Sequence, residues 1–175
     1  MSDAYPPESV VLRDGAAVTI RAIRPDDARR LQELFGRLSP ESIYLRFLEQ
    51  RKAVSNREAE RLATVDYDKQ MALVATCQEN DEEHIIGVAR YSAIDSSAQD
   101  SAEAAIVVED RFQGRGLGTL LADRLVKYAR AHGIQSFLAE VSIDNMRMIQ
   151  FIRRTGLPVK SKRDTGVWEL RVDLE

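Results

Sequence analysis

The sequence predicts a mixed α+β domain with one central, mostly antiparallel sheet flanked by helices. Three observations support this. Helical periodicity dominates residues 25–65, extended segments follow one another between residues 70 and 108, and helices and strands alternate from residue 117 onward. A length of 175 residues suits a single domain, which we expect to span residues 1–175.

The N-terminal residues 1–17 are expected to form a strand or hairpin extension of this domain. Residues 10–23 are two extended segments around Asp14-Gly15, a pair typical of two-residue hairpin turns. The first 15 residues do not combine a basic region with an apolar one, so they do not predict a secretory signal.

Three helices are predicted next. Pro25 opens the first, with two aspartates in its first turn, where carboxylates suit the helix dipole. Ser39 ends this helix and caps the second, whose first residue is Pro40. Residues 55–65 predict a short third helix. The apolar stripes consist of Ala28, Leu31, Leu34, Phe35 and Leu38 in the first helix, and of Ile43, Tyr44, Phe47 and Leu48 in the second.

Three sequential antiparallel strands are expected after the helices. Residues 70–78 and 84–94 are extended and are separated by the polar turn 79–83. After the loop 95–101, residues 102–108 form the third strand.

The C-terminal part alternates between helices and strands. It predicts, in order, a helix over 117–132, a strand over 136–143, a helix over 146–155 and a strand over 167–174. Gly133 and Gly156 end the two helices, and Asp144 or Asn145 can cap the second.

Composition argues against several classes of function. A formal charge of −3 with interspersed signs predicts no nucleic-acid partner, and no apolar run approaches the roughly 20 residues that span a bilayer. Cys77 is the only cysteine, which fits a reducing, cytoplasmic location and favours a core residue over a nucleophile. With only His84 and His132, no metal site or histidine-based triad is expected.

Three glycines, Gly114, Gly116 and Gly118, occupy alternate positions where the helix over 117–132 begins. A helix N-terminus carries unpaired amides and the positive end of the dipole. Without Cβ atoms, a bulky anion can approach these amides closely, so the segment predicts a diphosphate site.

Other interpretations of this segment were weighed. A P-loop requires Lys and Ser/Thr after its last glycine, but Thr119-Leu120 stands there. A dinucleotide fingerprint requires a third glycine at position 119, and five residues, 109–113, separate the motif from its strand. Glu140 lies near the spacing of a ribose-binding acid, so this alternative stays open, as does a glycine-rich loop without a ligand.

The segment QGRGLG, residues 113–118, matches the Q/R-x-x-G-x-G/A signature of the GNAT superfamily of acyl-CoA-dependent N-acyltransferases, and the order of elements resembles that fold along nearly the whole chain. A narrower resemblance, in residues 10–28, 38–47 and 113–121, is to the acetyltransferase domain of bacterial protein lysine acetyltransferases. These often carry an acyl-CoA-synthetase-like region, which the 175 residues lack, so we expect the catalytic domain alone.

The resemblance implies acetyl-CoA as the co-substrate and an amine, above all a protein lysine, as the acceptor. It implies that the strand before the motif separates from its neighbour and holds the pantetheine arm, while the motif amides wrap the pyrophosphate. The acetyl-CoA-binding residues would be Ile106, Val107, Val108, Gln113, Gly114, Arg115, Gly116, Leu117, Gly118, Thr119 and Asn145. For Asn145, a simple helix cap is an equal alternative.

Glu103 is the candidate general base. Attack on a thioester requires a neutral amine, whereas a free lysine has a pKa of ~10.4. Glu103 is the only ionisable residue between positions 101 and 108, and apolar neighbours would raise its pKa toward a useful value. A solvated charge at a strand end is the alternative; the narrower family keeps a glutamate here, which favours catalysis.

Ile152 departs from the superfamily pattern, because many members have a tyrosine there that protonates the leaving thiolate. We therefore expect no side-chain general acid at this position. The sequence predicts acetyl transfer to an amine by direct attack, with a small-molecule acceptor or a non-catalytic CoA-sensing domain as the alternatives.

Overall fold

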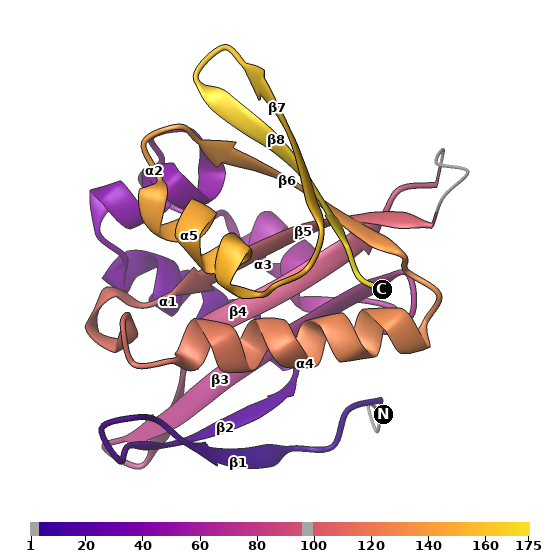
Figure 1. Ribbon diagram of the computed structural model, residues 1–175. Helices are drawn as coiled ribbons and strands as arrows, with labels where there is room; N and C mark the ends of the chain where they lie inside the picture. Colours follow the sequence, from indigo (N-terminus) through magenta and orange to yellow (C-terminus); the bar gives the residue numbers. More distant parts are fainter. Residues whose placement is uncertain (1–3, 96–99) are drawn as a thin grey trace.

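The computed structural model describes residues 4–95 and 100–175. Within these ranges the chain forms one eight-stranded sheet, in the order β1-β2-β3-β4-β5-β6-β8-β7, with helices on both faces (Figure 1). The predicted mixed sheet flanked by helices is confirmed. No helix of the described residues is long and apolar enough to cross a membrane.

The first five strands are antiparallel neighbours, and β6 joins them in parallel to β5. The bounds of the strands are β1 Glu8–Val11, β2 Ala17–Ala22, β3 Gln70–Glu79, β4 Glu82–Ala93, β5 Ser101–Val108, β6 Ser136–Ser142, β7 Val159–Asp164 and β8 Val167–Asp173. The predicted loop over 95–101 lies partly outside the described residues.

The helices form two layers. α1 Ala28–Arg37, α2 Pro40–Phe47 and α3 Asn56–Ala63 cover one face of the sheet, and α4 Leu117–Ala131 and α5 Met146–Arg154 cover the other (Figure 1). Each layer buries its own apolar cluster. Leu34, Phe35 and Ile43 belong to the cluster under α1–α3, and Leu121 and Leu125 of α4 belong to the other.

The predicted N-terminal hairpin is confirmed, but its two-residue turn is wrong. The amide of Leu12 donates to the carbonyl of Ala16, 2.9 Å away, so three residues form the connection. Gly15 closes it with a φ of +88°, a backbone conformation that the missing Cβ permits.

β7 is a strand that the sequence did not predict. All six of its residues are exposed, and its segment VKSKRD lacks the alternation that identifies a half-buried strand. Pairing with β8 stabilises it at the edge of the sheet. Its lysines therefore lie beside the site described below.

The helix predictions also need corrections. Pro25–Asp27 is a short 3-10 helix preceding α1, and Tyr44, expected in a buried stripe, is exposed. The Ser39 cap is confirmed, because its hydroxyl accepts a hydrogen bond from the amide of Ser42. Of the two possible caps of α5, Asn145 is the one whose side chain accepts a hydrogen bond from a helix amide.

Asp27 does more than occupy the first helical turn. It also belongs to a buried network of ion pairs. Its carboxylate is fully buried and accepts two hydrogen bonds from the Arg21 guanidinium, at 2.8 and 2.9 Å. Arg21 also binds Glu83, which ties the first helix to β2 and β4. This network fixes the helical layer on one face of the sheet.

Candidate functional site

The glycine motif forms the start of α4, as predicted. Gly116 is the N-cap with a φ of +89°, and no side chain caps the helix. Within the described residues, no acceptor pairs with the amides of Gly114, Arg115 or Gly116. The first amides of α4 have no intrahelical partner either. The motif therefore presents unpaired donors and the positive end of a 15-residue helix.

Side chains hold the motif against both neighbouring segments. Gln113 donates from Nε2 to the carbonyl of Val108, 2.9 Å away, and its Oε1 accepts from Arg147 of α5. The Arg115 guanidinium pairs with Asp14 of the hairpin at 2.7 Å. The motif is thus attached to the end of β5, to α5 and to the N-terminal hairpin.

Arg13 of the hairpin places its guanidinium directly over Gly116. A Cβ added to Gly116 would lie 3.3 Å from Nε of Arg13. Among the described residues, Arg13 forms no ion pair. An unpaired cation thus lies next to the unpaired amides, a combination that favours an anion.

Gly118 differs from the other two glycines of the motif. Its φ is not positive, and a Cβ there would meet Phe151 of α5 at 3.7 Å and Ile106 of β5 at 3.9 Å, both ordinary contacts. Gly118 thus lies where α4 passes between β5 and α5.

β5 and β6 form a fork. They pair in parallel over only three residues, and the last pair is Glu103 with Leu138. β5 then runs on to Val108 alongside β4 alone. The edge of β5 that carries Ile106, Val107 and Val108 therefore has no ladder partner on the β6 side.

An open cleft of about 730 Å³ reaches this fork. Ala104 and Ala105 of β5 and Leu138 and Ala139 of β6 line it, so both faces of the diverging strands border the cavity. The end of α2, the neighbouring strand β4 and the hairpin of β7 and β8 form its other walls. The small alanine side chains leave space where the strands separate.

Glu103 lines the cleft, and its side chain is exposed. The apolar neighbours that the sequence places beside Glu103 therefore do not cover its carboxylate. Since side chains alternate along a strand, Glu103 shares its face with Ala105 and with Arg90 of β4, opposite the face that carries α4. The motif and Glu103 therefore lie on different faces of the sheet, and the fork joins them.

The lining of the cleft is predominantly cationic. Of its described lining residues, five are cationic and three are acidic. They are Arg46, Arg90, Lys160, Lys162 and Arg171, and Glu103, Glu140 and Glu169. This balance lowers the pKa of a bound amine and favours anionic groups on a ligand.

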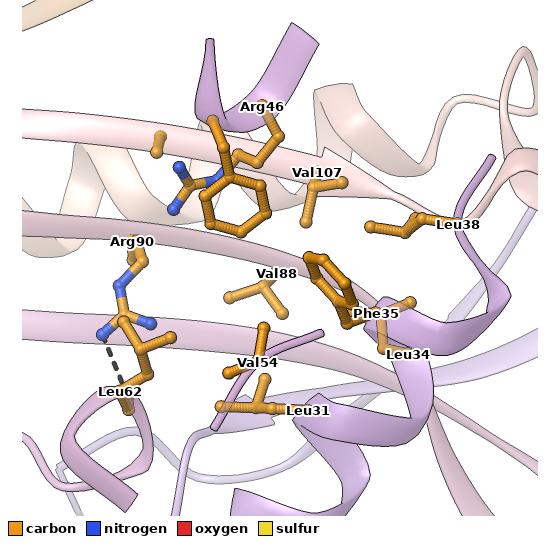
Figure 2. A pocket seen from close by; sticks show the side chains of 12 residues that line it. Leu31, Leu34, Phe35, Leu38, Arg46, Val54, Leu62, Val88, Arg90 and Val107 are labelled. Carbon is orange, nitrogen blue, oxygen red and sulfur yellow. Dashed lines mark hydrogen bonds between the residues drawn. The ribbon is translucent and has the colours of Figure 1, made fainter. Parts of the chain in front are cut away.

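A smaller apolar pocket of about 50 Å³ lies behind the cleft, between α1–α3 and the sheet (Figure 2). Leucines, valines and two phenylalanines form most of its wall. Arg46 and Arg90 line both this pocket and the cleft. They stand at the boundary between an apolar space and the open site.

Three other residues considered in the sequence analysis are Asn145, Ile152 and Cys77. The Asn145 side chain accepts from the amide of Met148, 3.2 Å away, so the helix-cap role is present. Ile152 is half-buried and packs against the core. Cys77 is half-buried in β3, where burial raises the pKa of its thiol, and it pairs with His84 at the far end of β4 from Glu103. A thiolate nucleophile at the fork is therefore not available from Cys77.

The dinucleotide alternative fails on the fold. That fingerprint belongs to a parallel sheet with helices between its strands. In the described sheet, six of the seven neighbouring strand pairs are antiparallel, and the one parallel pair, β5 with β6, extends over three residues. Glu140 is exposed and faces the cleft. Among the described residues, no group of three or more His, Cys, Asp or Glu side chains could hold a metal ion.

Arg46 and Arg90 were not identified from the sequence. For Arg90, a signal exists: a charged residue interrupts the apolar run IIGVARYSA. Arg46 follows the ordinary pattern of a helix surface, and only the packing of α2 against β5 brings it to the cleft.

Comparisons with known proteins agree with this geometry. Residues 33–157 match the model of the acetyltransferase (GNAT) family. The acetyltransferase PA5475 of Pseudomonas aeruginosa is 34% identical over 137 residues, which are 78% of this chain and 73% of that protein. The acetyltransferase Pat of Mycolicibacterium smegmatis is 34% identical over 96% of this chain, which spans about half, 49%, of Pat. The crystal structure of the GNAT domain of S. lividans PAT superposes with a TM-score of 0.86, at 32% identity, over 97% of this chain and 99% of that domain.

Proposed function

Because the chain belongs to the acetyltransferase (GNAT) family, we propose that it transfers the acetyl group of acetyl-CoA to a protein lysine side chain, with Glu103 as the general base. The observation that carries the proposal is the position of Glu103 at the last pair before β5 and β6 separate. A thioester that enters the fork from the motif side reaches the cleft beside this carboxylate.

The co-substrate is expected to lie along β5. The amides of the motif, from Gly114 to Thr119, would bind the pyrophosphate, with Gln113 positioning the loop. The unpaired edge at Ile106, Val107 and Val108 would bind the pantetheine arm. The five residue steps from Glu103 to Val108 span about 17 Å, a length that an extended pantetheine chain can follow.

The transfer is a direct displacement. The lysine nitrogen attacks the thioester carbonyl, a C–N bond forms, and the C–S bond breaks to release CoA thiolate. The proton of the amine passes to Glu103, directly or through water. Ile152 supplies no proton, so the thiolate takes one from solvent; a free thiol has a pKa of ~8.5, which makes it a good leaving group.

Asn145 has two compatible roles. Its side chain caps α5 through Met148, and the family resemblance assigns it to the CoA arm. The carbonyl oxygen of its amide group is used by the cap, which leaves the NH₂ group to donate to a ligand.

The ligand class is tested first by calorimetry of acetyl-CoA against NAD and ATP. We expect the protein to bind acetyl-CoA but neither NAD nor ATP. Binding of NAD without binding of acetyl-CoA would contradict the proposal. Acetylation of candidate proteins is then compared with that of a panel of small amines. Transfer confined to small amines would contradict the protein acceptor and leave the reaction class intact.

Glu103→Gln tests the base. We expect acetyl-CoA to bind as before and transfer to fall by about 100-fold or more. Glu140→Gln is the matched control, because Glu140 is also an exposed carboxylate in the cleft. Equal activity of the two variants would contradict the role of Glu103, and tight CoA binding without transfer to any acceptor would indicate a CoA-sensing domain.

A further inference from the structure

Two cationic side chains at the edge of the cleft have no acidic partner. Arg46 lies near the end of α2, and Arg90 lies in β4. In the part of the chain that the structure describes, no carboxylate is within ion-pair distance of either guanidinium. Both side chains are half-buried. A partly buried and unpaired cation is costly, so this arrangement calls for a ligand.

The contacts of the two groups leave most of their donors unused. Arg90 donates from Nη2 to the carbonyl of Leu62, 3.0 Å away, at the end of α3 (Figure 2). The Arg46 guanidinium lies over the ring of Phe47, 4.8 Å from its centroid. Each guanidinium has five N–H donors, so several of them can still bind an anion.

Local electrostatics agree with an anion site at these two arginines. Burial lowers the pKa of Arg90 to about 10, and the charge of Arg46 contributes to the same effect. Burial also lowers the pKa of Arg46, assisted by the charge of Arg51. Glu58, whose charge attracts Arg46, is already paired with Arg51. A bound anion would relieve this repulsion.

Both groups lie close to the reacting position. Figure 2 shows the two guanidinium groups at the same end of the apolar pocket, away from Leu38. Arg90 is opposite Ala105 in the β4–β5 ladder, one same-face step from the pair of Ser92 and Glu103. The Cβ atoms of Arg90 and Glu103 are therefore roughly 7 Å apart. An anion held here would be part of the molecule that reacts.

We propose that Arg46 and Arg90 form a carboxylate-binding subsite beside Glu103. The planar donor fork of arginine matches a carboxylate, and the three glutamates of the cleft disfavour a more highly charged anion. The carboxylate has two possible sources: an acidic residue next to the target lysine, or the distal carboxylate of a dicarboxylic acyl-CoA. The inference rests on the proposed function for the identity of the reacting molecules.

Matched substrates test the subsite in the full chain. For the acceptor, N-acetyl-Glu-Lys-amide is compared with N-acetyl-Gln-Lys-amide, with acetyl-CoA as the donor. For the donor, succinyl-CoA is compared with butyryl-CoA. Within each pair, kcat/KM is measured. Kd is also measured by calorimetry, for the two acyl-CoAs on the free protein and for the two peptides on the CoA-saturated protein. The variants are Arg46→Gln and Arg90→Gln, with Arg57→Gln of α3 as a control that lines neither cavity.

We expect the wild type to prefer the charged member of one pair by about tenfold or more, the ratio for one charge-assisted hydrogen bond. The pair that shows the preference identifies the source. Arg46→Gln and Arg90→Gln should bring the ratio close to one, and Arg57→Gln should keep it. If Arg90→Gln does not fold, Arg90→Lys, which keeps the charge and loses the fork, should lower the ratio.

No preference in either pair, or a preference that survives in both glutamine variants, would overturn the subsite. The calorimetric ratios do not depend on turnover. If Glu103→Gln kept full transfer, the proposed base would be wrong, and the ratios would still decide whether Arg46 and Arg90 bind a carboxylate.

Discussion

Glu103 faces Leu138 in the last parallel pair between β5 and β6. Beyond this pair the strands separate, and the cleft on the α1–α3 face reaches the gap between them. The glycine motif lies on the opposite, α4 face. One interrupted ladder therefore connects the glycine-rich start of α4 to an exposed carboxylate across the sheet.

Enlarging Ala105 should block this connection. Ala105 lines both the cleft and the apolar pocket, on the same face as Glu103. We expect Ala105→Leu to displace the reacting group and lower kcat/KM by about 100-fold, since a misplacement of about 1 Å has an effect of this size. Affinity for CoA, which we propose is held mainly at the motif, should change little. Steady-state kinetics and calorimetry measure the two quantities.

Ala53→Leu adds the same volume at an exposed loop position and should leave both quantities unchanged. Unimpaired transfer in Ala105→Leu would show that the acetyl group does not pass through the fork.

Gly116→Ala should weaken acetyl-CoA binding. Its φ of +89° strains any residue with a Cβ, by roughly 1–2 kcal/mol, and the added atom would displace Arg13 and crowd the motif amides. Gly133, with a φ of +81° just beyond the other end of α4, provides a control of similar backbone strain. We expect both variants to lose stability to a similar extent in thermal unfolding.

Only Gly116→Ala should lower the affinity measured by calorimetry. Equal affinities of Gly116→Ala, Gly133→Ala and the wild type would show that the start of α4 does not hold the pyrophosphate.

Arg13→Ala should reduce acetyl-CoA affinity roughly fivefold at low salt, the effect of about 1 kcal/mol. The Arg13 guanidinium lies over Gly116 and has no ion-pair partner within the described residues. Because exposed charge interactions are screened, the difference from the wild type should shrink as salt is added. Calorimetry at two ionic strengths measures this, and Arg154→Ala, which removes an exposed charge at the end of α5, serves as the control.

An affinity of Arg13→Ala that matches the wild type at low salt would assign phosphate binding to the motif alone. The hairpin would then have only a structural role, through the pair of Arg115 with Asp14.

Local signals were sufficient to predict most of the fold. Helix starts at Ser39 and at the glycine motif depend on adjacent residues, and strand segments such as β3 show as apolar runs. β7 escaped prediction because its exposed, charged residues gain stability only from pairing with β8. The burial of Asp27 also depends on distant partners, Arg21 and Glu83.

The candidate site, like the fold, could be predicted from the sequence only in part. Glu103 and the glycines lie in one short stretch of the chain, residues 103–118, and could be singled out with the help of a family resemblance. The exposure of Glu103 and the meeting of Arg46 with Arg90 depend on strand register and on helix packing, which no local pattern encodes. The sequence therefore singled out the proposed base, Glu103, but not the cationic residues that line the cleft beside it.

Asp27→Asn should destabilise the fold by about 3 kcal/mol at neutral pH, because it leaves the buried Arg21 cation with one carboxylate fewer. Burial alone would raise the pKa of Asp27, but hydrogen bonds from Arg21 and from the amide of Arg24 outweigh it and hold the pKa below its usual value. A carboxyl whose folded-state pKa is lowered stabilises the protein above its unfolded pKa of ~3.9. This stabilisation is lost as the pH falls through the lower, folded-state pKa.

The difference in unfolding free energy between the wild type and Asp27→Asn should therefore be constant from neutral pH down to about pH 5 and shrink below roughly pH 4. Urea unfolding at several pH values measures it. Asp123→Asn, at an exposed pair with Lys127 on α4, should differ from the wild type by less than about 1 kcal/mol at every pH. A difference for Asp27→Asn that did not shrink in acid would mean that packing of the side chain, and not its ionised carboxylate, anchors the first helix to the sheet.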